Sequence, residues 1–151
     1  MKLKTLLTLA IASICSWNSA WADDVVANVT LKEKNSLASE VLALSNIDDL
    51  KTVTHLTVST NEGVQLGDED WTTMQTMGAL VELDLSNASA NEIPSNQFSS
   101  YFEDLTTVKL PKDLKTIGAY AFNGKSMITS LVIPNTVTKI GEYAFSGCYA
   151  L

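Results

Sequence analysis

Apolar and polar residues alternate in a short pattern that returns along the chain. Val108 and Leu110 are separated by one polar residue, and Leu131 and Ile133 repeat this spacing in the next unit. Successive side chains of an extended strand point to opposite faces, so the apolar members of each pair share one face. The pattern therefore predicts one short strand per unit, with these side chains directed inward: Leu56, Val58, Leu83, Leu85, Val108, Leu110, Leu131 and Ile133.

The two clearest units match each other position for position. Residues 105–124 and 128–147 align without a gap, which places Ile117 opposite Ile140 and Phe122 opposite Phe145. Two more divergent units precede them, so that units start near residues 53, 80, 105 and 128 at steps of 27, 25 and 23. Such periods are typical of repeats that stack on one another, because a single unit cannot bury its own apolar face.

Each unit also contains a return segment after the strand. Residues 114–117 and 137–140 share an apolar-x-x-apolar pattern that predicts a second short extended segment. Ala121-Phe122 and Ala144-Phe145 then bring a small and a large side chain back to the core, and we expect a single helical turn there. Taken together, the units predict an α/β repeat fold in which each turn has two extended segments.

The unit that starts near residue 53 has a more helical return. Trp71, Met74 and Met77 follow one another at helical spacing, with Asp68 placed as the capping residue. The acidic run Asp68-Glu69-Asp70 favours the positive end of a helix dipole. Calcium binding is the alternative, but no loop of alternating acids with a distal glutamate accompanies the run.

The segment ahead of the repeats predicts a cover for the first turn. Residues 25–31 have the pattern of a strand, and a short helix is expected from Ser36, with Leu37, Val41 and Leu44 on one face. The end turn of a repeat stack needs such a cover over its apolar core. We therefore expect an N-terminal cap over residues 23–49 and repeats over residues 50–151.

The segment 1–22 is typical of an export signal. Lys2 and Lys4 precede an apolar run over residues 6–14, and a small-x-small site predicts cleavage after Ala22. Lipidation at Cys15 is the alternative, although the residue before it is not the small one that lipidation needs. No later stretch approaches the ~20 apolar residues of a transmembrane helix. We therefore expect a secreted or cell-surface protein.

Charge and cysteine content narrow the classes of function. Removing residues 1–22 takes away two lysines and no acidic residue, which changes the formal net charge from −7 to −9, and the chain has no arginine. This balance disfavours binding to nucleic-acid phosphates or anionic membranes. Cys148 is the single cysteine left after cleavage, so we expect a buried thiol and stability that comes from packing.

Residues 131–148 carry the pattern LxIPxxVxxIGxxAFxxC and resemble the BspA-type leucine-rich-repeat family. The resemblance is close over residues 105–151, although Lys125 stands where the next unit has Cys148 and the earlier units are longer. It implies a right-handed superhelical solenoid with short β-strands on the concave face. It also implies secreted or surface proteins that adhere to host proteins or to other cells, with no catalytic residues and no cofactor.

A solenoid aligns the strand residues that face away from the core, turn after turn, on one side. These residues are the candidate ligand face: His55, Thr57, Glu82, Asp84, Thr107, Lys109, Ser130 and Val132. The alternative is that they are only strand-favouring, soluble residues. For His55, a solvated strand position is favoured over a Ser-His-acid site. For Tyr120 and Tyr143, filling between turns is favoured over an aromatic strip for sugars or peptides.

The function that these patterns favour is binding of an extracellular protein or glycan, with adhesion as the leading hypothesis and no catalytic, cofactor or metal residues. A larger secreted enzyme, such as a peptidase or glycosidase, that uses the repeats for binding is the alternative. A spacer role is the third possibility. Because a further unit begins at Leu151, we also expect the last turn to fray or associate at its exposed edge.

Overall fold

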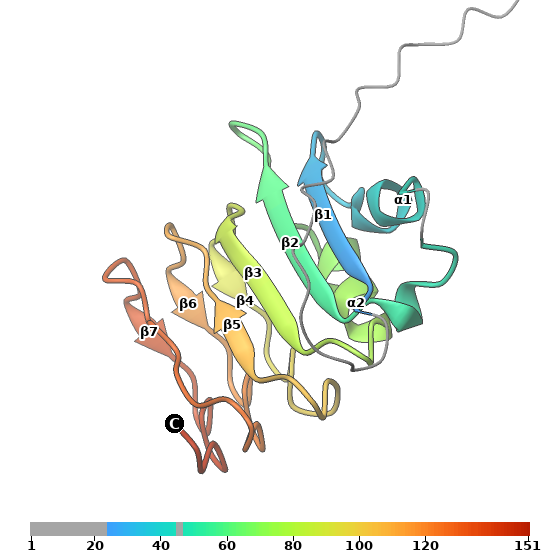
Figure 1. Ribbon diagram of the computed structural model, residues 1–151. Coiled ribbons are helices and arrows are strands. Elements are labelled where there is room, and N and C mark those ends of the chain that lie inside the picture. The colour runs from blue at the N-terminus through green and yellow to red at the C-terminus, as the bar shows by residue number, and fades with distance from the viewer. Residues whose placement is uncertain (1–23, 45–46) are drawn as a thin grey trace, which may run out of the picture.

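The computed structural model describes residues 24–44 and 47–151. The predicted signal over residues 1–22, its cleavage site and Cys15 lie outside these residues. Figure 1 shows successive turns of chain lying side by side, with strands in two rows and the helices α1 and α2 at the N-terminal end. No helix in the described part of the chain combines the length and apolar character needed to cross a membrane.

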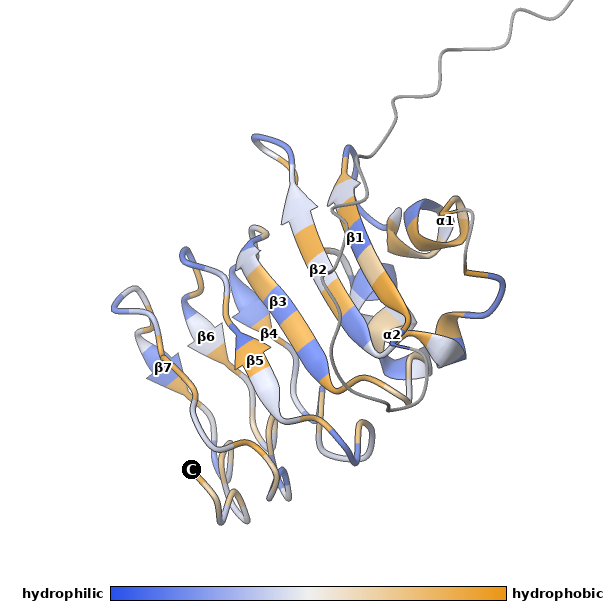
Figure 2. Ribbon diagram, viewed as in Figure 1, coloured by the Kyte–Doolittle hydropathy of each residue, from blue (hydrophilic) through white to orange (hydrophobic). Residues whose placement is uncertain are grey.

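The first row of strands is a parallel four-stranded sheet. It contains β1 (Val26–Leu31), β2 (His55–Thr60), β3 (Glu82–Asn87) and β5 (Thr107–Lys109), in the order β1-β2-β3-β5. Buried and less buried residues alternate along each strand, and Figure 2 shows the matching bands of hydropathy. The inward residues predicted for the first three units are buried. The strand segment of the predicted cap continues this sheet, because β1 pairs with β2.

The second row confirms the return segments. β4 (Glu92–Ile93), β6 (Thr116–Ile117) and β7 (Lys139–Ile140) form a parallel three-stranded sheet in that order. Ile117 is in register with Ile140, the pairing that the repeat pattern predicts. Phe98, Phe122 and Phe145 stack between turns, with ring centroids 4.8 Å and 5.4 Å apart. Side chains from both sheets belong to one hydrophobic core.

The predicted helical turns at Ala121-Phe122 and Ala144-Phe145 are wrong. The backbone makes hydrogen-bonded turns there and no helix is formed. The reason lies one residue earlier, where Tyr120 and Tyr143 have φ angles of 57° and 55°. This left-handed conformation cannot continue into a right-handed helix.

The helices of the N-terminal end are α1 (Leu37–Leu42) and α2 (Asp68–Thr76), with a 3₁₀ helix at Leu50–Thr52. Leu37 and Val41 of α1 are buried in the same core as Trp71 and Met74 of α2. The predicted apolar faces of both helices are therefore confirmed.

The prediction that Asp68 caps α2 is wrong. Gly67 is the capping residue, and the buried Asp70 serves this helix end instead. One oxygen of the Asp70 carboxylate accepts hydrogen bonds from the N–H groups of Gly67 and Asn35, both at 2.8 Å. Its other oxygen accepts from the N–H group of Leu37 at 2.9 Å. One carboxylate therefore joins the starts of both helices, which supports the helix-start interpretation of the acidic run.

The last described turn has an exposed edge, as the sequence predicts. Leu131 is half-buried and Ile133 is 41% exposed, which does not contradict their predicted inward position, because both lie at the uncovered edge of the stack. Ile140 is exposed and Phe145 is half-buried for the same reason: no described turn packs beyond them. An apolar side chain in a repeat stack is buried by the turn that follows it as much as by its own turn.

Gly118 allows adjacent turns to approach closely. A Cβ atom at this position would lie 2.5 Å from the backbone nitrogen of Ser95 and 2.8 Å from the carbonyl oxygen of Ile93. Because both neighbours are backbone atoms, the turns would have to separate. We expect Gly118→Ala to lower the free energy of unfolding by about 1–3 kcal/mol in urea titrations. Gly78→Ala is the control, since its Cβ would meet nothing within 4 Å; an equal loss in both variants would contradict the explanation.

Candidate binding face

The candidate residues occupy one face of the first sheet, which we call the open face: the side of β1, β2, β3, β5 and the segment 129–135 that lies opposite the core. His55 is in register with Glu82, Glu82 with Thr107, and Thr107 with Ser130 through a single bridge. The structure therefore brings this predicted row together.

The second predicted row is also in register over three turns. Thr57 pairs with Asp84, and Asp84 pairs with Lys109. Val132 follows on the next turn and is 80% exposed. Sequence reasoning missed that β1 adds Val26 opposite His55 and Asn28 opposite Thr57. The signal was present in the sequence, because Val26 precedes His55 by 29 residues and Ala27 and Val29 stand opposite the buried Leu56 and Val58.

Asp84 and Lys109 form a hydrogen-bonded ion pair on the open face. The Lys109 ammonium donates to the Asp84 carboxylate at 2.7 Å, and Ser86 donates to the same carboxyl group through its hydroxyl and its N–H. Partial burial acts to raise the pKa of Asp84, but these hydrogen bonds outweigh it and hold the pKa below its ordinary value. The hydrogen bond to Asp84 raises the pKa of Lys109. Both charges therefore persist at neutral pH.

His55 is less solvated than predicted. Its side chain is 26% exposed, and its Nδ1 atom is 2.9 Å from the hydroxyl oxygen of Thr54. Carboxylate oxygens of Asp24 and Glu82 lie 3.9 Å and 4.0 Å from its ring nitrogens. The Thr54 hydroxyl also accepts a hydrogen bond from the N–H group of Val25 and donates one to the Val25 carbonyl oxygen. Thr54 therefore has a structural role. The arrangement holds the imidazole ring in place on the open face.

Two hollows lie on the open face. The smaller, of about 140 Å³, lies between β2, β3 and β5, and all six candidate residues of those strands line it. The larger, of about 570 Å³, lies between the segments 106–112 and 129–135, with Ser86 at its edge. Thr107 and Lys109 line both hollows, and Ser130 and Val132 line the larger one. Every candidate residue therefore lines a hollow.

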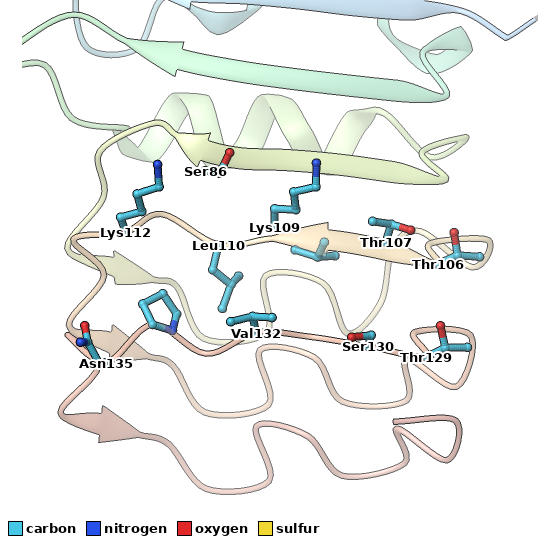
Figure 3. A pocket seen from close by; sticks show the side chains of 12 residues that line it. Ser86, Thr106, Thr107, Lys109, Leu110, Lys112, Thr129, Ser130, Val132 and Asn135 are labelled. Atoms are coloured by element: carbon cyan, nitrogen blue, oxygen red, sulfur yellow. The ribbon is translucent and has the colours of Figure 1, made fainter.

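Figure 3 shows how side chains are arranged around the larger hollow. Lys109 and Lys112 extend toward β3, where Ser86 lies, while Leu110 and Val132 lie between the two chain segments. Threonine and serine hydroxyls occupy the other end, at Thr106, Thr107, Thr129 and Ser130. The larger hollow thus combines a cationic edge, an apolar floor and a hydroxyl-rich end. This mixture suits a ligand with both apolar and charged groups.

The tyrosine pair lies at the surface, where its two rings pack against each other between neighbouring turns. The Tyr120 and Tyr143 rings stack with centroids 5.2 Å apart, and the residues are 39% and 61% exposed. Both residues have a left-handed backbone, with φ angles of 57° and 55°. Because the two rings stack on each other, their facing surfaces are not open to a ligand.

Lys125 and Cys148 occupy equivalent positions in neighbouring turns. Lys125 is buried, and its ammonium donates to the carbonyl oxygens of Tyr101 and Phe102. Burial lowers the pKa of Lys125 and raises the pKa of the half-buried Cys148 thiol, which donates to the carbonyl of Phe122. Both side chains therefore satisfy backbone oxygens of the preceding turn. Within residues 24–44 and 47–151, no cluster of three or more His, Cys, Asp or Glu residues could hold a metal ion.

One strand of the first sheet per turn, parallel pairing between turns and a shared apolar column define a leucine-rich-repeat protein. Residues 72–151 match the family described as "BspA type Leucine rich repeat region (6 copies)". The chain belongs to this family, and the resemblance seen in its repeat pattern is confirmed.

The fold is also similar to a solved structure, that of a leucine-rich repeat protein from Bacteroides ovatus ATCC 8483. The two share 18% sequence identity with a TM-score of 0.51, over 82% of this chain and 35% of that one. This similarity shows the leucine-rich-repeat fold, and the chain spans 35% of the length of that protein. Among curated proteins, none matches the chain.

Proposed function

We propose that this protein is a secreted or cell-surface binding protein that adheres to host proteins or to other cells through the open face. The observation that carries the proposal is the gathering of all eight candidate residues around two adjoining hollows on that face. In the proposed full protein the turns continue as a right-handed superhelix, and the open face is its concave side. The role is binding rather than catalysis.

Two features support a binding role for this face. Its central ion pair, between Asp84 and Lys109, is held by hydrogen bonds and leaves the Lys109 side chain 61% exposed. Its apolar residue Val132 is largely exposed, and apolar side chains beside ordered polar groups are typical of recognition surfaces. Export through the signal over residues 1–22 would place this surface outside the cell.

The test is attachment of the secreted protein to plates coated separately with plasma proteins, collagen and mucin. Replacing both members of the central pair, as Asp84→Ala with Lys109→Ala, removes the charges without leaving either one unpaired. We expect attachment to at least one coating to weaken by about tenfold or more, because contacts near the centre of an interface carry most of its binding energy.

The matched control is Lys115→Ala with Glu142→Ala, which removes one cation and one anion from exposed positions near the second sheet. Attachment that is unchanged by the Asp84 and Lys109 substitutions, with folding preserved by circular dichroism, would contradict a role for the open face. It would favour the spacer role instead. A catalytic motif encoded downstream of the repeats would favour the enzyme-associated role.

A further inference from the structure

Charge is distributed very unevenly between the two halves of the chain. Residues 24–104 contain three lysines and 14 acidic residues, whereas residues 105–151 contain five lysines and two acidic residues. The larger hollow lies in the lysine-rich half, and Lys109 and Lys112 line it. None of its lining residues is acidic. The hollow is therefore a cationic site on a strongly acidic protein, which points to an anionic ligand.

The two lysines differ in what they are bound to. Lys109 donates to Asp84, so its charge is largely balanced by that carboxylate. Lys112 is exposed, and among the described residues its ammonium has no ion-pair partner. Lys112 lines the hollow, and Figure 3 shows its side chain extending toward β3. Lys112 is thus the group that a ligand carboxylate can pair with directly.

The floor of the hollow identifies the neutral part of the ligand. Leu110, Val132 and Pro134 line it, and Val132 is 80% exposed, so an apolar group from a ligand would remove that side chain from water. No aromatic residue lines the hollow, which leaves it without the flat ring face on which a sugar packs. An aliphatic side chain fits these surroundings better than a sugar ring.

The backbone around the hollow explains why a chain segment fits there. Among the described residues, strand pairing between these two turns on the open face is limited to the bridge from Thr107 to Ser130. Beyond the bridge the two segments do not pair as strands. The hydroxyl groups of Thr106 and Thr129 lie at the hydroxyl-rich end of the hollow. A volume of about 570 Å³ lies within the range of about 300–1,000 Å³ that is typical of ligand sites. It has room for a few peptide residues.

We propose that the larger hollow binds an extended acidic peptide segment, which places an aliphatic side chain on Leu110 and Val132 and a neighbouring carboxylate on Lys112. The inference rests on the proposed binding function and assigns its ligand class. Hydroxyl groups at the other end of the hollow hydrogen bond to the peptide backbone. The ion pair from Asp84 to Lys109 forms the wall nearest β3 and keeps a second carboxylate away from that side.

The test uses the secreted protein and fluorescein-labelled octapeptides, with binding followed by fluorescence anisotropy. The first peptide alternates leucine with glutamate, the second leucine with lysine, and the third serine with glutamate. We expect the first to bind at least about tenfold more tightly than the other two, and its binding to weaken as salt is added. Lys112→Glu should weaken that binding by about tenfold or more, and Val132→Asp by a similar factor.

Lys139→Glu is the matched control, since it makes the same charge change at an exposed lysine of β7 and should leave the affinity unchanged. Equal binding of the three peptides, or equal losses from Lys112→Glu and Lys139→Glu, would overturn the inference. So would tighter, Lys112-dependent binding of a heparin-derived oligosaccharide.

If plate attachment depends on Asp84 and Lys109 while the peptide does not bind, the peptide assignment fails and the proposed function stands. If the peptide binds while the protein attaches to none of the coatings, the peptide assignment stands and the proposed adhesion function fails.

Discussion

Replacing Phe122 with alanine is expected to lower the free energy of unfolding by about 3–5 kcal/mol. Phe122 is fully buried in the middle of an aromatic column, 4.8 Å from Phe98 on one side and 5.4 Å from Phe145 on the other. Truncation removes its own apolar surface from the core and leaves a cavity between three turns. It also ends two ring contacts, each worth about 0.5–1.5 kcal/mol beyond surface burial.

Urea titrations followed by circular dichroism measure this effect. Phe145→Ala is the matched control, because the same ring is half-buried in the last described turn and has an aromatic neighbour on one face. We expect its cost to be clearly smaller. Phe122→Leu should recover part of the loss, since leucine keeps most of the buried volume. Equal destabilisation by Phe122→Ala and Phe145→Ala would show that the column does not hold the turns together.

The repeat spacing in the sequence was sufficient to predict which residues of neighbouring turns lie side by side, including Phe122 and Phe145 of the aromatic column. Because each turn adds one strand in fixed register, residues that are one repeat apart must lie beside one another, and His55, Glu82, Thr107 and Ser130 do so. The repeat likewise predicted the pairing of Ile117 with Ile140. These features follow from periodicity alone, since the stacking geometry is the same for every turn.

Features that depend on the ends of the stack could not be predicted in this way. Ile133 has the same pattern as Leu110, yet it is exposed because burial comes from the next turn rather than from its own sequence. The larger hollow has a similar origin, because it lies where strand pairing has narrowed to one bridge, from Thr107 to Ser130. A hydrophobic pattern predicts which face a residue occupies, but not how closely the neighbouring turn approaches.

Backbone conformation was a second source of error. A helical turn was predicted at Ala121-Phe122 and Ala144-Phe145. The residues before them, Tyr120 and Tyr143, have left-handed φ angles, and hydrogen-bonded turns form there instead. Bulky residues rarely adopt this conformation, so no general sequence rule would have placed it there. Both tyrosines occupy the same position in successive turns, so the conformation repeats with the stack.

Replacing Asp70 with alanine is expected to lower the free energy of unfolding by at least about 3 kcal/mol, because each buried donor left without an acceptor costs about 1–3 kcal/mol. The Asp70 carboxylate is fully buried and accepts hydrogen bonds from three backbone N–H groups, those of Gly67, Asn35 and Leu37. The donors of Asn35 and Leu37 lie beside the start of α1, so the substitution also loosens α1 from α2.

Asp70→Asn makes the test more specific than truncation. An amide keeps nearly the same shape, but it has one acceptor oxygen, and its NH₂ group must face an N–H donor at either position. We therefore expect Asp70→Asn to lose much of the stability that Asp70→Ala loses, and Asp70→Glu to be disruptive because the longer side chain must fit a fully buried site.

Asp68→Ala is the control: Asp68 is exposed in the first turn of the same helix, and its loss should cost about 0.3–1 kcal/mol through the helix dipole. If Asp70→Asn proved as stable as the parent protein in urea titrations, buried space rather than hydrogen bonding would explain the position. If Asp68→Ala and Asp70→Ala cost the same, the carboxylate would act only through its charge at the helix end.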